Sequence, residues 1–313
     1  MINYYKTVGS VTQQIPQMEP GCWINVCAPD LEERNWLINS LDIPPEFLQA
    51  SLDEEESSHI EAEDGQTLII IDVPFAEMQD DGIAYYTIPI GIIVCPKNIV
   101  TVSIKDNSVI REFADGVIKG VNTTLRTRFF LQILLRMATR FLQHLKQIDK
   151  RSTHLERQLR KSMRNKELIQ LLDLQKSLVY FQTSLKSNEI TLEKITKNRA
   201  IALYEEDQEL LEDVMIEIKQ AIEMSNIYLS ILSGTMDAFA SVISNNLNIV
   251  MKVLTSITIV MAIPTMIFSF YGMNIGEAAG SLPFASNIIV PIVIAVIGTL
   301  IAAIFLLSKG MFK

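Results

Sequence analysis

Seven small or polar residues follow one another at steps of three and four along an apolar stretch near the end of the chain. They are Asn248, Met251, Thr255, Thr258, Ala262, Thr265 and Ser269. At 100° per residue these positions span about 100° of arc on a helix, so their side chains share one face. The same pattern occurs where helices pack against one another in a membrane. Several copies with this face turned inward would instead surround a narrow path lined by oxygens, which suits a hydrated hard cation.

The helix that carries this polar face belongs to the first of two apolar stretches, each long enough to cross a hydrocarbon core of about 30 Å. The two stretches cover 253–270 and 288–307. Three lysines flank them on one side: Lys252, Lys309 and Lys313. The connecting segment 271–287 contains no Lys or Arg. The positive-inside rule therefore predicts a multi-pass protein of the cell membrane, with both termini in the cytoplasm and the connecting segment outside.

The segment Tyr271-Gly272-Met273-Asn274 stands directly after the first stretch. Taken alone, Gly272 would fit a turn that ends a helix, because glycine readily adopts the left-handed conformation. Here the motif follows the first of two carboxy-terminal spans, and the segment 248–255 precedes it at the cytoplasmic side. This combination resembles the CorA family of magnesium and cobalt transporters, whose signature is Gly-Met-Asn at this place.

The resemblance implies a fold and an ion path. The fold would be an αβα amino-terminal domain, a long stalk helix and two membrane helices, assembled as a funnel of five identical subunits. Tyr271, Gly272, Met273 and Asn274 would form the outer selectivity filter, with the amide of Asn274 bound to the water shell of the incoming ion. Magnesium gives up its waters reluctantly, so recognition through the shell is chemically reasonable. The family's pore wall matches Asn248, Met251, Leu254 and Thr265.

The resemblance also implies how the channel is regulated. Asp213 and Asp237 lie on the predicted stalk, where the family carries aspartates. Cytoplasmic Mg2+ that bridges such carboxylates between subunits would hold the channel shut. The alternative is that both aspartates belong to a solvated helix face. No resident cofactor is implied, because Mg2+ is both the transported and the regulatory ion, with Co2+ and Ni2+ as further cargo.

The chain before the membrane stretches holds nearly all of the 36 acidic and 27 basic residues, in a sequence of mean hydropathy +0.24. We expect an α+β domain at 1–120, and apolar or β-branched runs predict strands within it. These runs are 23–26, 67–73, 85–94 and 99–104. Asp64-Gly65 predicts a hairpin turn, and the apolar spacing between 31 and 52 predicts two short helices.

Proline is absent between Pro96 and Pro264, which predicts long helices. We expect a helical region at 121–206, made of one amphipathic stretch at 125–148 and a hairpin at 155–195. The hairpin would turn near Arg164-Asn165-Lys166. It is basic, where the resemblance suggests an acidic tip. Its basic residues are Lys150, Arg151, Arg157, Arg160, Lys161, Arg164 and Lys166.

A stalk at 207–252 is predicted to run into the first span at 253–270, and 308–313 would form a short cytoplasmic tail. Residues of one heptad position recur every seven along the stalk: Leu211, Ile218, Ser225, Leu232 and Phe239. Such a seam lets identical helices pack side by side. It would equally suit a helix that packs against its own domain. Its continuity with the membrane span favours neighbouring subunits as the cover.

Several classes of function are disfavoured. The three histidines, His59, His144 and His154, have no metal-binding spacing, and no nucleophile motif or phosphate loop occurs, so we do not expect an enzyme. The three cysteines, Cys22, Cys27 and Cys95, fit small core residues of a reduced protein. A net charge of −9 argues against nucleic-acid binding.

The sequence therefore predicts a homo-oligomeric channel for divalent cation uptake, with Mg2+ as the expected ion and the membrane potential as the driving force. A transporter of zinc or another transition metal from the same superfamily is the nearest alternative. The polar face favours a hard ion, since it offers oxygens and one sulfur but no His or Cys. A membrane-anchored oligomeric sensor or scaffold is the second alternative, and it leaves the polar face without a role.

Overall fold

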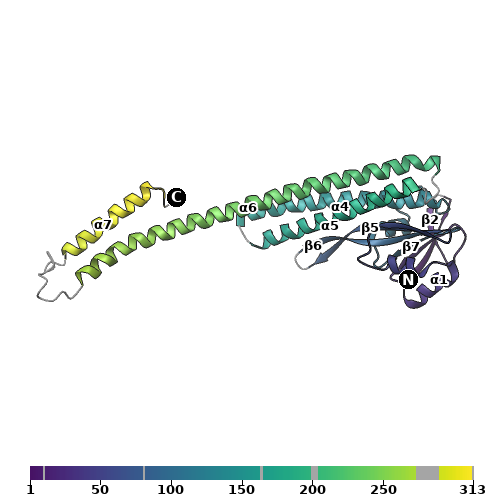
Figure 1. Ribbon diagram of the computed structural model, residues 1–313, viewed down its shortest axis with the longest axis horizontal. Helices are drawn as coiled ribbons and strands as arrows, with labels where there is room; N and C mark the ends of the chain where they lie inside the picture. The colour runs from purple at the N-terminus through teal and green to yellow at the C-terminus, as the bar shows by residue number, and fades with distance from the viewer. Residues whose placement is uncertain (10, 80–81, 163–164, 199–203, 273–288, 312–313) are drawn as a thin grey trace. The chain divides into compact units, whose positions relative to one another are not determined.

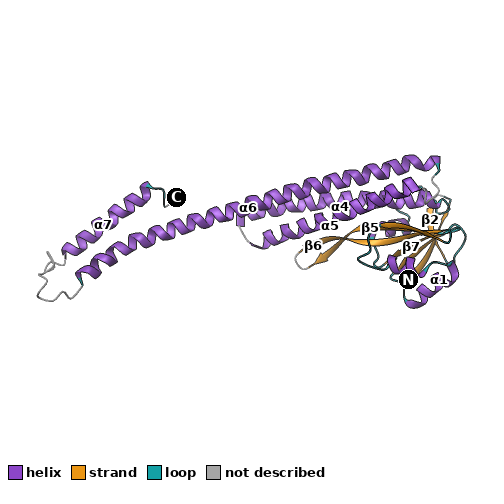
Figure 2. Ribbon diagram, in the orientation of Figure 1, coloured by secondary structure: helices purple, strands orange, loops and turns teal. Residues whose placement is uncertain are grey.

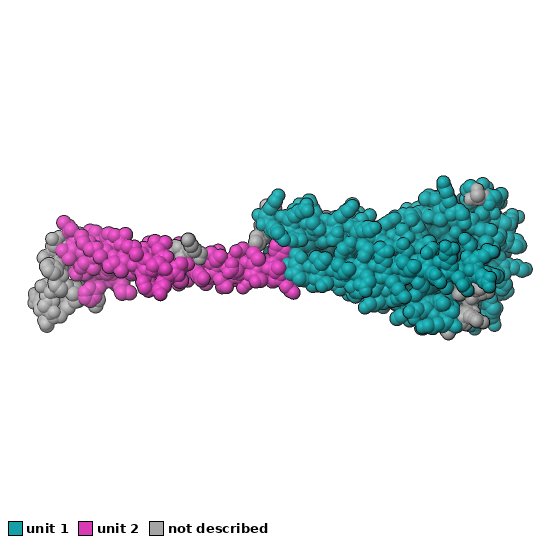
Figure 3. All heavy atoms as spheres, turned by 90° about the horizontal axis from the view of Figure 1, so that it is seen from above, with its two compact units in different colours: residues 1–235 teal, residues 236–313 magenta. Residues whose placement is uncertain are grey.

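The computed structural model describes residues 1–313 except 10, 80–81, 163–164, 199–203, 273–288 and 312–313. The chain divides into two compact units, Met1–Thr235 and Met236–Lys313, which Figure 3 distinguishes by colour. Every strand among the described residues lies in the first unit (Figure 2). One helix, α6 (Gln208–Tyr271), contributes to both units.

The first unit is built on a seven-stranded mixed sheet in the order β2-β1-β3-β7-β6-β5-β4. The strands are β1 (Ile2–Val8), β2 (Val11–Ile15), β3 (Trp23–Cys27), β4 (His59–Glu63), β5 (Gln66–Gln79), β6 (Gly82–Val94) and β7 (Ile99–Ser103). The central β3–β7 pair is parallel and the other pairs are antiparallel. The four predicted runs are confirmed as β3, β5, β6 and β7. Asp64 and Gly65, at φ 48° and 74°, form the predicted hairpin turn between β4 and β5.

Helices cover both faces of this sheet, which confirms the αβα layering. On one face, α1 (Leu31–Leu41) and α2 (Pro45–Ser51) bury Leu37 and Phe47 in a core shared with alternate residues of β3, β5 and β7. On the other face, Trp23 packs against Phe129 at 5.3 Å between ring centroids. Phe129 belongs to α4 (Arg126–Ser162), and it also meets Phe113 of α3 (Ser108–Ala114).

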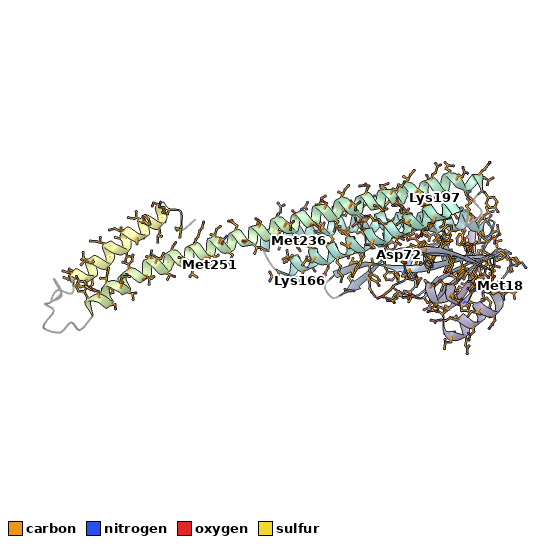
Figure 4. The ribbon with its side chains drawn as sticks, viewed as in Figure 1. Met18, Asp72, Lys166, Lys197, Met236 and Met251 are labelled. Atoms are coloured by element: carbon orange, nitrogen blue, oxygen red, sulfur yellow. The ribbon has the colours of Figure 1, made fainter. Side chains whose placement is uncertain are left out.

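One polar side chain takes the place of a missing strand at the β5 edge. Asn188 of α5 (Asn165–Asn198) is 2% exposed. It accepts the backbone N–H of Asp72 at 2.9 Å and donates to the backbone carbonyl of the same residue at 2.8 Å. The pairing of β4 with β5 ends at His59 opposite Ile70, before Asp72 is reached. Without Asn188, the part of β5 around Asp72 would be an open sheet edge. Burial raises the pKa of the Asp72 carboxyl, which lies between β5 and the helices (Figure 4).

Two prolines inside the β5–β6 ribbon fit the same edge. Pro74 lies two residues beyond Asp72, so its nitrogen points to the side of β5 where no strand pairs. Pro89 of β6 lies opposite Asp72, and its nitrogen points to the β7 side. The pairing of β6 with β7 ends next to it, at Ile90 opposite Ser103, so no β7 residue lies opposite Pro89. Neither ring therefore removes a ladder hydrogen bond, and both long strands continue through a residue that usually ends them.

In the first unit α5 runs antiparallel to both α4 and α6, so α4 and α6 run in the same direction (Figure 1). α4 continues through 149–154, so the predicted separation of an amphipathic stretch at 125–148 from a hairpin at 155–195 is wrong. The sequence there is polar on the exposed face, but it contains no helix breaker. α4 ends at Ser162 and α5 begins at Asn165, beside the predicted turn.

The heptad seam of α6 packs inside the chain, at least over the first unit. Leu211, Ile218, Ser225 and Leu232 are all buried there, at 7%, 0%, 0% and 4% exposure. The Ser225 hydroxyl donates to the Leu178 carbonyl of α5 at 3.2 Å. Over these residues the expectation that neighbouring subunits cover the seam is therefore wrong, because α4 and α5 reach far enough along α6 to cover it.

The second unit consists of α6 from Met236 onward and α7 (Ile289–Ser308). By length and composition, α6 and α7 each contain a stretch that is apolar and long enough to cross a membrane. The predicted span 253–270 lies within α6, and the predicted span 288–307 coincides with α7 to within one residue at each end. The fold therefore places two candidate spans at the end of the chain, as the sequence predicts.

Candidate functional site

The polar face of α6 is exposed along its whole length in the single chain. All seven of its residues are exposed, as is Leu254 between them. Met251, which Figure 4 labels, is 53% exposed, and Leu254 is 57% exposed. No described residue of α7 covers this face. The helix therefore carries the predicted arrangement of residues, and it leaves that face available.

The opposite side of α6 faces α7. Half-buried and buried residues of this side include Val253, Ser256, Val260, Ile263 and Ile267. They recur at steps of three and four, and their mean direction lies about 150° from that of the polar face. Gly298 of α7 sits so close that a Cβ atom there would lie 3.2 Å from Cγ2 of Ile263. Small residues allow such close packing of membrane helices. The contact between the two spans thus uses a different face from the polar one.

The hydroxyl groups of the polar face are oriented by the helix itself. Thr258 donates to the Leu254 carbonyl at 2.9 Å, and Thr265 donates to the Met261 carbonyl at 3.0 Å. Because each hydroxyl proton is used inside the helix, the oxygen presents its lone pairs outward. A row of lone pairs accepts hydrogen bonds from water, including the polarised waters around a cation.

The described part of the signature segment ends at Gly272. Tyr271 is half-buried, and its ring packs edge-on against Phe270 at 5.8 Å between centroids. The Gly272 N–H donates to the Phe268 carbonyl at 2.9 Å, which continues the helical pattern, and its φ is not left-handed. The interpretation of Gly272 as a left-handed helix end is therefore wrong. Met273 and Asn274 lie outside the described residues.

The two candidate regulatory aspartates lie on α6 and are exposed. Asp213 is in the first unit and Asp237 in the second. Among the residues that the structure describes, no three His, Cys, Asp or Glu side chains are grouped closely enough to hold a metal ion. The described residues of one chain therefore offer neither aspartate a group of three such side chains.

One contact of the spans was not predicted from sequence. The Ser256 hydroxyl donates to the Lys252 carbonyl at 2.8 Å and lies 3.4 Å from the Met311 carbonyl. Gly310, at φ 68°, lets the chain turn after α7 and brings Met311 to this position. This contact ties the Lys252 end of the first candidate span to the residues after α7. A serine within an apolar stretch, on the side opposite the polar face, was its only sign in the sequence.

The chain has an α/β body followed by two apolar helices, and the first of these, α6, begins within the body. This organisation is that of a membrane protein with two carboxy-terminal spans. The family model described as CorA-like Mg2+ transporter protein matches residues 19–309. The chain belongs to this family, which is one of transporters rather than enzymes.

Individual relatives agree with this membership. The chain is 29% identical over 274 residues to the cobalt/magnesium transport protein CorA of Methanocaldococcus jannaschii. The aligned region covers 85% of this chain and 82% of the relative. The complete structure of the CorA magnesium transporter from that organism has a TM-score of 0.78 at 23% identity, over 99% of this chain and 96% of the other. The cytoplasmic domain of ZntB from Vibrio parahaemolyticus has a TM-score of 0.58 at 13% identity, over 78% and 96%. Both structural likenesses, at 23% and 13% identity, concern the fold alone.

Proposed function

We propose that several copies of this chain form a channel that carries divalent cations, Mg2+ first among them, through the cell membrane into the cytoplasm. The observation that carries the proposal is the polar face of α6, which α7 leaves uncovered and whose threonine oxygens point their lone pairs outward. Polar groups within a span are costly against lipid, so a wetted path shared between copies is the favourable surrounding.

The chemistry of this lining suits a hydrated Mg2+. Hydroxyl and amide oxygens accept hydrogen bonds from the first water shell, so the ion crosses without giving up all of its waters. Met251 and Leu254 would form the narrow apolar section near the cytoplasmic end, and Asn248 the amide ring beside it. Tyr271, Gly272, Met273 and Asn274 would form the outer filter.

The subunit count and the driving force follow from the same proposal. The resemblance to the family leads us to propose five identical subunits. The lysines beside the spans, Lys252, Lys309 and Lys313, lead us to propose that both termini are in the cytoplasm. An inside-negative potential draws a divalent ion inward with roughly 4.6 kcal/mol per 100 mV, twice the value for a single charge. Passive conduction therefore suffices, and no nucleotide is needed.

The test is ion flux into liposomes that contain the purified chain. We expect Mg2+ uptake that competes with Co2+ and Ni2+ more strongly than with Zn2+, and a large loss in Asn274→Ala. Cysteines at Thr258 and Thr265 should react with aqueous thiol reagents, whereas Ile257→Cys, about 120° from the centre of the polar face, should not. Equal reactivity at all three positions, or none at Thr258 and Thr265 in the conducting state, would show that the polar face does not line a path.

Regulation by cytoplasmic Mg2+ is a separate part of the proposal. Internal Mg2+ would bridge Asp213, and similarly Asp237, to carboxylates of a neighbouring copy and hold the closed state. Asp213→Ala should then weaken the inhibition of flux by internal Mg2+. Glu212→Ala, at the exposed neighbouring position, is the matched control. Unchanged inhibition in Asp213→Ala would leave this aspartate as part of a solvated face.

A further inference from the structure

The end of the α4–α5 hairpin carries a concentration of positive charge that the ion path does not use. Between 150 and 166 the sequence has seven basic residues and a single acidic one, Glu156, in a chain whose net charge is −9. Arg157, Arg160 and Lys161 are all exposed at the end of α4. Leu155 and Leu159, on the other side of the same turns, are 4% and 1% exposed. We call the three exposed basic residues of α4 the basic tip.

Little within the first unit neutralises the basic tip. Glu156 accepts from Arg160 at 2.6 Å, with the arginine side chain 69% exposed. Such an exposed pair one helical turn apart is weak and leaves the arginine available to a stronger partner. No described carboxylate forms an ion pair with Arg157 or Lys161. Lys166, at the start of α5, adds to the positive charge of the same end (Figure 4).

The topology of the first unit places the basic tip at the end from which α6 continues to the membrane. α5 runs antiparallel to α6, because Gln182 bonds Asn226 whereas Gln175 bonds Ser233, the latter at 2.9 Å. The start of α5 and the end of α4 therefore lie at the end of the first unit at which α6 leaves it, after Thr235. The basic tip is therefore at the end of the first unit from which α6 continues towards the first span.

We propose that the basic tip binds the anionic headgroups of the inner leaflet. Clusters of Lys and Arg beside the cytoplasmic end of a span are attracted to a negatively charged lipid surface, and the attraction falls off within about 10 Å at 0.1 M salt. Each such residue near the surface favours docking roughly fivefold, so neutralising three lowers the ratio of docked to undocked hairpins roughly 100-fold. Lipid charge would thus bias the position of α4 and α5, and through their contacts that of α6.

The experiment uses the full chain in nanodiscs of phosphatidylcholine alone or mixed with phosphatidylglycerol. Amide hydrogen exchange over the end of α4 is measured for the native chain and for Arg157→Gln/Arg160→Gln/Lys161→Gln. The matched control removes the same charge elsewhere on exposed surface, in Lys97→Gln/Lys119→Gln/Lys219→Gln. We expect slower exchange in the anionic discs for the native chain and the control, reversed by high salt, and no dependence on lipid for the triple variant of the basic tip.

Two results would overturn the proposal. One is exchange at the end of α4 that is the same in both lipids for the native chain. The other is protection in both lipids that disappears in the triple variant, which would identify an acidic protein surface as the partner. The inference rests on the two spans of the proposed function, but exchange requires no conduction. A chain without ion flux that keeps the lipid dependence would therefore disprove the channel and not the headgroup contact.

Discussion

Replacing Asn188 by alanine tests how the helices are joined to the sheet. The change removes the partners of both the N–H and the carbonyl of Asp72, and it also removes the acceptor of the Ser58 hydroxyl at 2.8 Å. A buried backbone group left without a partner costs about 1–3 kcal/mol, so the two groups of Asp72 together cost about 2–6 kcal/mol. For a domain of this size 1 kcal/mol shifts the melting temperature by roughly 2–4 °C, so we expect a decrease of roughly 10 °C.

The assay follows tryptophan fluorescence during thermal unfolding of the purified chain. Both tryptophans, Trp23 and Trp36, lie in the first unit, so their signal reports that unit and not the spans. Thr183→Ala is the control, since its hydroxyl bonds only the Val179 carbonyl of the same helix and the residue is exposed. The reasoning is refuted if Asn188→Ala melts within about 2 °C of Thr183→Ala, the effect of 1 kcal/mol or less.

Three further predictions concern the spans and the sheet edge. Gly298→Val should force α7 away from Ile263 and lower the temperature at which the far-ultraviolet helical signal is lost, without moving the tryptophan transition. Thr265→Val should slow Mg2+ flux roughly 5- to 10-fold through loss of one outward-facing oxygen, while Thr299→Val, whose hydroxyl also bonds its own helix, should not. Burial raises the pKa of Asp72, so its ionised form is disfavoured in the folded state and stability falls as pH rises above 3.8. Asp72→Asn should therefore raise the tryptophan melting temperature at neutral pH, by a margin that closes as the pH approaches that value.

The sequence predicted the strands that are buried and missed those that are not. β3, β5, β6 and β7 contain continuous apolar or β-branched runs, and such runs identify a buried strand. β4 reads His59–Glu63, a polar segment that becomes a strand only by pairing with β5 across the Asp64-Gly65 turn. β1 and β2 are half-exposed, and they depend on pairing with β3, which local sequence does not reveal.

The seam of α6 shows a different limit of sequence reasoning. Periodicity reveals which face of a helix is apolar, but it does not reveal what covers that face. Ser225, in the middle of the seam, bonds α5 of the same chain, a contact between residues 47 positions apart. The polar face of α6 could be recognised from the sequence because its period is local to one helix, whereas the structure alone shows that α7 leaves it uncovered. The ligands of a regulatory ion could not be deduced, since no three His, Cys, Asp or Glu side chains are grouped around Asp213 among the described residues of its own chain.

The continuity of α6 also has a consequence for biosynthesis. The links that complete the first unit are long in sequence, since Thr7 bonds Thr123 and Asp72 bonds Asn188, each pair 116 positions apart. The unit further requires α6 up to Thr235, and the same helix then becomes the first span. The soluble part of a nascent chain can therefore finish folding only when the ribosome is about to deliver the hydrophobic segment to the insertion machinery. A mutation that delays the folding of the sheet would expose an incomplete domain at the moment of membrane insertion.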